Sequence, residues 1–328
     1  MMRLQPVITY LLTTLLILGC WGGTGAFQKY GPGCNSQREN LGIATIPTKW
    51  TLQDMGKFTL GDLTVTTNLS DALPAAANLL CASGLPGCQN PSLEDSLRTI
   101  RDWARRVRTE TDRHLYRFRR APAEFENSEG FFRMLMLTVV LQEDFGVHYD
   151  ESRKGASPSA SPQDGFFSQP QLVFLQGLLG PKRAGTCSSM PVLYVAIGRE
   201  LGYPLKLVTT KGHLFARWDG RGERFNVEAT SRGLNRFDDD RYRRWPFPIT
   251  PEDERREGYL KSLSPSEELA VFLSIRGMSF RDLGKPREAA EAFSAAVKLA
   301  PDVREYKAVL AQLQNYLAAS RPQNLYGN

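Results

Sequence analysis

Cys187 and His213 are two residues of this chain whose types and spacing could do chemistry together. Cys187 lies in the segment RAGTCSSMPVLYVAIGRELGYP, at the start of a helical apolar run. Unpaired N–H groups and the helix dipole at such a position favour a thiolate over a thiol. A thiolate nucleophile needs a base, and His213 is the only histidine that follows Cys187. The alternative is a small buried Cys187 and an ordinary strand-end His213.

An acceptor for the His213 ring is predicted on the strand that follows it. The segments HLFARW and RFNVEA flank Asp219-Gly220-Arg221-Gly222, a turn signal that predicts a β-hairpin. With a four-residue loop, His213 faces Glu228. With a loop of only Asp219-Gly220, it faces Asn226. Both candidates share its face of the sheet, and a buried ion pair without catalysis would give the same pattern.

The apolar pattern predicts the elements that would position these residues. From Ser92 the spacing is helical, with a Ser-x-x-Asp start that resembles a capping box. A second apolar helix ends at Gly146, and helical spacing resumes in QLVFLQGLLG. The Cys187 helix has Pro191 in its first turn and stops at Gly202. The segments LKLVTT, HLFARW and RFNVEA are predicted strands.

The C-terminal part is predicted to be helical and resembles one tetratricopeptide repeat followed by a further helix. The resemblance rests on small and apolar residues at repeat-like spacing, namely Gly277, Gly284, Ala289, Phe293, Ala296 and Pro301. A single repeat cannot form the extended groove of longer arrays. We therefore expect it to cap the preceding domain, with docking of a partner protein as the alternative.

Three segments, GTCSSMPVLYVAIGRELGYP, KGHLFARWDG and RFNVEAT, resemble the transglutaminase-like superfamily. The resemblance spans roughly residues 90–260 and implies an α+β fold with a papain-like core. Cys187 at a helix N-terminus would be the nucleophile and His213 the base. The family often has Asp-Pro-Thr where this chain has Glu228-Ala229-Thr230, which favours Glu228 over Asn226 as the third member. The repeat-like tail fits a bacterial branch of the superfamily.

The N-terminus has the features of an export signal. One Arg at position 3 precedes an apolar run from Val7 to Leu18, which is short for a membrane span. The run ends in Ile-Leu-Gly-Cys, which resembles a bacterial lipobox and predicts that Cys20 is lipidated. Cleavage after Ala26, giving a soluble secreted or periplasmic protein, is one alternative, and a retained membrane anchor is another. We expect an extracytoplasmic, membrane-anchored lipoprotein.

Export bears on the remaining cysteines. Cys81 and Cys88 lie in CASGLPGC, a Gly/Pro loop that predicts a small disulfide ring, and Cys34 has no evident partner. The sequence contains no CxxC pair and no His cluster, so no metal site and no organic cofactor is implied. The net charge of +6 is a mild excess that does not indicate nucleic-acid binding.

These features divide the chain into four parts. We expect a signal peptide at 1–19, a loosely structured region at 20–91, a transglutaminase-like domain at 92–262 and repeat-like helices at 263–320. The predicted function is cysteine-dependent chemistry on an amide bond of a protein or peptide substrate, as a protease, peptidase, deamidase or transglutaminase. The alternative is a non-catalytic interaction or scaffold module that uses the same fold and its repeat.

Overall fold

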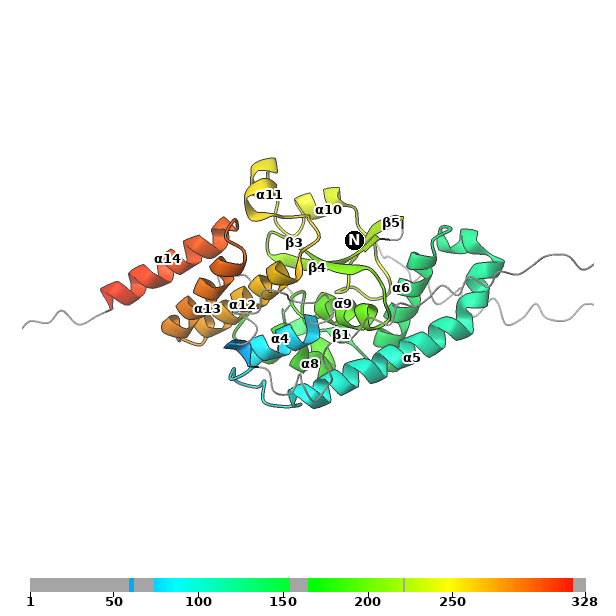
Figure 1. Cartoon of the computed structure of the whole chain (residues 1–328), viewed down its shortest axis with the longest axis horizontal. Helices are drawn as coiled ribbons and strands as arrows, with labels where there is room; N and C mark the ends of the chain where they lie inside the picture. The colour runs from blue at the N-terminus through cyan, green and yellow to red at the C-terminus, as the bar shows by residue number, and fades with distance from the viewer. Residues whose placement is uncertain (1–58, 62–73, 154–164, 221, 321–328) are drawn as a thin grey trace, which may run out of the picture. The chain divides into compact units, whose positions relative to one another are not determined.

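The protein is a mixed helix-and-sheet, α+β structure (Figure 1). The computed structural model describes residues 59–61, 74–153, 165–220 and 222–320, so Cys20, Cys34 and the predicted signal peptide lie outside the described residues. Within the described ranges, no helix is both long enough and apolar enough to cross a membrane.

Several helices of the first half pack on the helix that follows Cys187. They are α4 (Pro74–Ala82), α5 (Leu93–Arg120), α6 (Glu129–Val139), α7 (Pro170–Val173), α8 (Leu175–Leu179) and α9 (Met190–Glu200), with short helical turns at Pro122–Phe125, Val140–Asp144 and Glu151–Arg153. Ser92 caps α5 by accepting from the Asp95 N–H, as predicted. The apolar run after Ser128 ends at Gly146, whose φ of 70° suits glycine.

The second half contains the sheet and the C-terminal helices. The strands are β3 (Leu205–Thr210), β4 (His213–Gly220) and β5 (Glu223–Val227), which form one antiparallel sheet in chain order, and β1 (His148–Tyr149) pairs in parallel with β2 (Ala184–Gly185). The helices are α10 (Asp239–Arg244), α11 (Pro251–Glu257), α12 (Pro265–Asp282), α13 (Pro286–Leu299) and α14 (Arg304–Ala319).

The two faces of the three-stranded sheet have different chemistry. One face contributes Leu207, Leu214 and Ala216 to the main hydrophobic core, against α9. The opposite face contributes Val208 and Phe215 to a second, smaller apolar cluster, which α10 covers. Because side chains alternate along a strand, the odd positions of β4, including His213, lie on this second face.

Helix α4 corrects the expected boundary of the first domain. Residues 74–91 were predicted to belong to a loose N-terminal region, yet all nine residues of α4 are buried and most of them join the main core. Apart from Asn78, which accepts from the Leu175 N–H at 3.0 Å, the segment PAAANLLCA is apolar on every side, as expected of a helix enclosed by others. Arg276 of α12 donates to the Cys81 and Ser83 carbonyls at 2.6 and 2.7 Å, at the C-terminal end of α4.

The predicted C-terminal helices are α12, α13 and α14, and the first of them packs on the core. α12 contacts α4, and close packing of α12 on α13 depends on Gly277, since a Cβ there would lie 2.6 Å from the Phe293 ring. Ala289 and Ala296 are fully buried. This packing fits a cap on the preceding domain.

Candidate active site

Cys187 lies in a tight turn immediately before α9. The N–H groups of Ser189 and Met190 both donate to the Thr186 carbonyl, at 3.1 and 2.9 Å, which leaves the Cys187 N–H outside the hydrogen bonds of the turn. Ser189 Oγ accepts from the Thr186 N–H at 3.0 Å and donates to the Leu172 carbonyl at 2.7 Å. The turn is therefore held by hydrogen bonds within itself and by one to the Leu172 carbonyl.

Cys187 is partly exposed although its surroundings are buried. Thr186, Ser188 and Ser189 are buried, whereas Cys187 is half-buried. Gly185 permits this arrangement because a Cβ there would lie 2.6 Å from Ser189 Oγ and 2.7 Å from a Leu178 methyl carbon. The position just before the first helical turn agrees with the expectation for a nucleophile.

His213 and Glu228 are in direct contact. His213 Nε2 lies 2.8 Å from Glu228 Oε2, and both side chains are buried. Cys187 is near enough to the imidazole to contribute, with Glu228, to raising its pKa. The structure thus brings together the three residues predicted for the site, from the turn before α9, the start of β4 and the residue that follows β5.

The hairpin register differs from both registers considered for the sequence. Gly220 pairs with Glu223, so two residues separate the strands. The four-residue loop would instead have paired Trp218 with Glu223. In the observed register position 228 is aligned with Phe215, and Glu228 reaches His213 diagonally. Compared with the four-residue loop, each residue of β4 is opposite a residue two positions further along the second strand, and a shift of two positions preserves the face. The shared face was therefore predicted correctly from an incorrect loop.

The carboxylate of Glu228 has donors on both oxygens. Oε1 accepts from the Thr230 N–H at 3.0 Å and from Thr230 Oγ1 at 2.5 Å. Oε2 accepts from the Tyr242 hydroxyl at 3.0 Å in addition to the contact with His213. These donors compensate the desolvation of a buried carboxylate.

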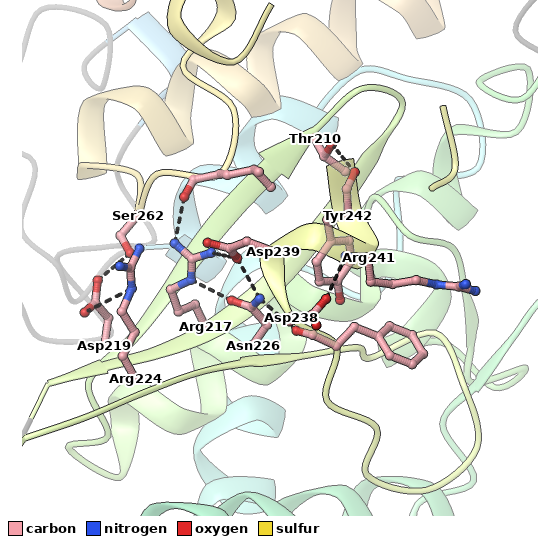
Figure 2. Close-up of polar contacts among 12 residues, drawn as sticks. Thr210, Arg217, Asp219, Arg224, Asn226, Asp238, Asp239, Arg241, Tyr242 and Ser262 are labelled. Carbon is pink, nitrogen blue, oxygen red and sulfur yellow. Dashed lines mark hydrogen bonds and ion pairs between the residues drawn. The ribbon is translucent and has the colours of Figure 1, made fainter. Parts of the chain in front are cut away.

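Asn226, the alternative partner of His213, serves another residue. Its Oδ1 accepts from Arg217 Nε at 2.6 Å, and its Nδ2 donates to Asp239 Oδ1 at 2.8 Å and to the Phe237 carbonyl at 2.8 Å (Figure 2). Arg217 lies on the same face of β4 as His213, four residues further along the strand. The Asn226 amide, which the sequence left as a possible acceptor for the imidazole, therefore accepts from the buried Arg217 guanidinium instead.

His213 and Glu228 each stabilise the charged form of the other. Burial acts to lower the pKa of His213, but hydrogen bonds to Cys187 and Glu228 and their charges outweigh it, so the pKa lies above its ordinary value of 6.5. Burial acts to raise the pKa of Glu228, but His213 and Thr230 outweigh it, so the pKa lies below 4.5. The geometry favours an imidazolium beside a carboxylate.

This pair predicts a specific dependence of stability on pH. Stabilisation by His213 is complete below pH 6.5 and is lost as the pH rises through its raised folded pKa. Stabilisation by Glu228 is complete above pH 4.5 and is lost as the pH falls through its lowered folded pKa. The difference in unfolding free energy between wild type and Glu228→Gln, from urea titrations, should therefore be greatest between pH 4.5 and 6.5. A difference that rises steadily up to pH 9 would contradict this.

Tyr149 and Tyr242 are site residues that the sequence analysis missed. Tyr149 pairs with Gly185 across β1 and β2, and burial and then the charge of Cys187 raise its pKa, so its hydroxyl stays protonated. Tyr242 comes from α10. The segments HY and DDRYRR carry no local signal for such roles, because long-range packing brings them to the site.

The other predicted cysteine feature is not present in the structure. Cys81 and Cys88 are free thiols, so the predicted disulfide is not formed. Burial raises the pKa of each thiol to about 12, against a smaller lowering by Arg276. Since thiol–disulfide exchange requires a thiolate, both are poorly disposed to react at neutral pH. Among the described residues, no group of three or more His, Cys, Asp or Glu side chains could hold a metal ion.

Comparison of this chain with protein-family models, with curated proteins and with solved structures gave no match.

Proposed function

We propose that this protein is a cysteine-dependent enzyme acting on amide bonds, with a papain-like, transglutaminase-like core. The observation that carries the proposal is the juxtaposition of a partly exposed Cys187, a buried His213 whose pKa it helps to raise, and a carboxylate 2.8 Å from Nε2 of that imidazole. This is the arrangement of nucleophile, base and orienting group used in covalent acyl transfer. The proposed substrate is a protein or peptide.

In the proposed reaction, the Cys187 thiol gives its proton to His213 and the sulfur attacks the amide carbonyl carbon. The tetrahedral intermediate then collapses, His213 gives the proton to the leaving amine, and an acyl-thioester remains on Cys187. Water, deprotonated by His213, releases the acid, or an amine takes the acyl group. Glu228 orients the ring throughout and stabilises its positive charge.

Two groups are suited to stabilise the negative oxygen of the intermediate. The Cys187 N–H is not used by the turn before α9, and the Tyr149 hydroxyl, whose pKa burial and then the charge of Cys187 raise, stays protonated. Donors fixed at the position where charge develops lower the barrier because they need no reorganisation. We propose both as oxyanion donors.

The proposed place of action is outside the cytoplasm, at a membrane to which Cys20 would be attached by lipid. This part of the proposal rests on the residues Ile17-Leu18-Gly19-Cys20 and on the apolar run before them.

Alkylation of the intact protein tests the proposed chemistry without a known substrate. We expect iodoacetamide to modify Cys187 at pH 6 nearly as fast as at pH 8, because His213 retains the thiol proton. An ordinary thiol loses about tenfold in rate for each pH unit below its pKa of about 8.5. Peptide mapping should show Cys81 and Cys88 unmodified, since both are buried. A Cys187 rate that falls like that of an ordinary thiol would favour the non-catalytic interaction module.

A further inference from the structure

Tyr242 contacts the same carboxylate oxygen as the imidazole. Its hydroxyl donates to Glu228 Oε2 at 3.0 Å, and His213 Nε2 lies 2.8 Å from that atom. The tyrosine is fully buried, and its ring stacks on Phe215 with 3.7 Å between centroids and 2° between planes. Phe215 is aligned with position 228 in the hairpin, so the stack lies directly beside the carboxylate.

Helix α10 is attached to the sheet at both ends of this stack. At the end of β3, Thr210 Oγ1 donates to the Tyr242 carbonyl at 3.0 Å. At the start of α10, Asp239 Oδ1 accepts from Arg217 Nη2 at 2.6 Å and from Asn226 Nδ2 at 2.8 Å (Figure 2). The position of the Tyr242 hydroxyl is therefore determined by contacts on both sides of it.

In the cluster of Arg217, Asn226 and Asp239, the Arg217 guanidinium is costly to bury. The Arg217 side chain is 1% exposed, and the cluster completes its hydrogen bonds through the Leu260 carbonyl, 2.8 Å from Nη1. A buried guanidinium needs such compensation, and α10 supplies its anion. The cluster lies on the face of the sheet that carries His213 and Glu228, although it contacts neither of them.

We propose that Tyr242 is a positioning residue for Glu228, and that the cluster of Arg217, Asn226 and Asp239 holds Tyr242 in place. The inference rests on the proposed function, since it assigns a role in orienting His213 for chemistry at Cys187. Tyr242 and Thr230 together provide three donors to the carboxylate besides the imidazole. Loss of one of them leaves a buried anion that is less well compensated.

Several titratable groups face Glu228. His213 lies on β4, Tyr242 on α10, and the charge of Glu228 also acts on Tyr194 of α9 and Tyr149 of β1. Burial and then the charge of Glu228 raise the pKa of Tyr242, which keeps its hydroxyl protonated as a donor. None of the three tyrosines titrates in the acid range. An acid transition sensed by the His213 ring therefore reports the protonation of Glu228.

Tyr242→Phe tests the role of the hydroxyl. The variant keeps the stacked ring and removes one donor, so Glu228 should accept a proton more easily. We expect the acid transition of the His213 imidazole signal, followed by NMR, to move upward by about one pH unit, because a hydrogen bond to an ion is worth about that much. The acid limb of Cys187 alkylation should move with it. The chain has three histidines, so His114→Gln and His148→Gln assign the signal.

Tyr259→Phe is the matched control, since it removes a hydroxyl that donates to Glu305 at 3.3 Å, away from the site. It should leave the His213 transition unchanged. Thr230→Val removes the Oγ1 donor from Oε1 and gives the expected size of shift for one lost donor. It also tests dependence on carboxylate donors if Tyr242→Phe does not fold. Superimposable titrations of wild type and a folded Tyr242→Phe, or no shift in Thr230→Val, would overturn the proposal.

Asp239→Asn tests the cluster. Loss of a nearby negative charge by itself would move the Glu228 transition downward. If the cluster acts by holding Tyr242, the transition should instead move upward, and the double variant with Tyr242→Phe should shift no more than Tyr242→Phe alone. A downward or additive shift would overturn the role of the cluster.

The two measurements separate this inference from the proposed function. The His213 titration needs no reaction at Cys187. A shifted transition with an unreactive thiol would reject the proposed enzyme and retain Tyr242 as a positioning residue. A reactive thiol with an unshifted transition would retain the proposed enzyme and reject Tyr242 as a positioning residue.

Discussion

His213→Gln is expected to slow alkylation of Cys187 at pH 6 by about a hundredfold, while the rate at pH 9 changes little. Without the imidazole, the thiol has no nearby group to retain its proton. An ordinary thiol is ionised to only about one part in three hundred at pH 6. The measurement is the second-order rate of iodoacetamide incorporation at Cys187, followed by mass spectrometry between pH 5 and 9.

Glu228→Gln should give an intermediate loss of about tenfold at pH 6. The amide can still accept from His213 Nε2, but the negative charge that supports the imidazolium is gone. Asn226→Ala should be milder in rate, because Asn226 contacts Arg217 and Asp239 and not the imidazole. Thermal unfolding checks that each variant is folded. A larger loss in Asn226→Ala than in Glu228→Gln would reject the assignment of the third residue.

Glu268→Gln is expected to lower the free energy of unfolding by about 3–5 kcal/mol, the usual loss when one partner of a buried ion pair is removed. Glu268 of α12 accepts from Arg199 of α9 through both oxygens, at 2.6 and 2.9 Å, and the side chains are 3% and 7% exposed. Arg199 also donates to the Leu205 carbonyl at 2.9 Å. The substitution would remove the charge of the carboxylate that accepts from Arg199 through both oxygens. Urea titration at pH 7 measures the loss.

Glu94→Gln is the matched control. It removes the same type of charge from a pair with Arg98 in which both side chains are 53% exposed. Solvent screens such a pair, and the expected change is within about 0.5 kcal/mol. A similarly small loss for Glu268→Gln would show that the ion pair between α9 and α12 is dispensable.

The pair of Arg199 and Glu268 connects the two regions that the sequence separated. Arg199 is in the helix that follows Cys187, and Glu268 is in the first of the repeat-like helices. A C-terminal region attached in this way behaves as part of the folded domain. Destabilising α12 should therefore disturb α9 as well, which favours the cap over an independent docking module.

Local periodicity predicted much of the fold. The segments LKLVTT and HLFARW form β3 and most of β4, and α9 follows Cys187 with Pro191 at its start. These features depend on alternation, helical spacing and end signals among neighbouring residues, which are written in the chain itself. The segment at 74–82 was missed because its helix is enclosed on all sides and its Gly/Pro-rich surroundings dominated the average composition.

The sequence by itself determined which residues could form the site and that His213, Asn226 and Glu228 share one face of the hairpin, because side-chain direction alternates regardless of register. Only the tertiary structure decided between the two acceptors. The buried Arg217 takes Asn226, and Tyr242 and Thr230 compensate the charge of Glu228. Desolvated charges must find partners from distant segments, and those partners depend on how α10 packs on the sheet, which no local pattern encodes.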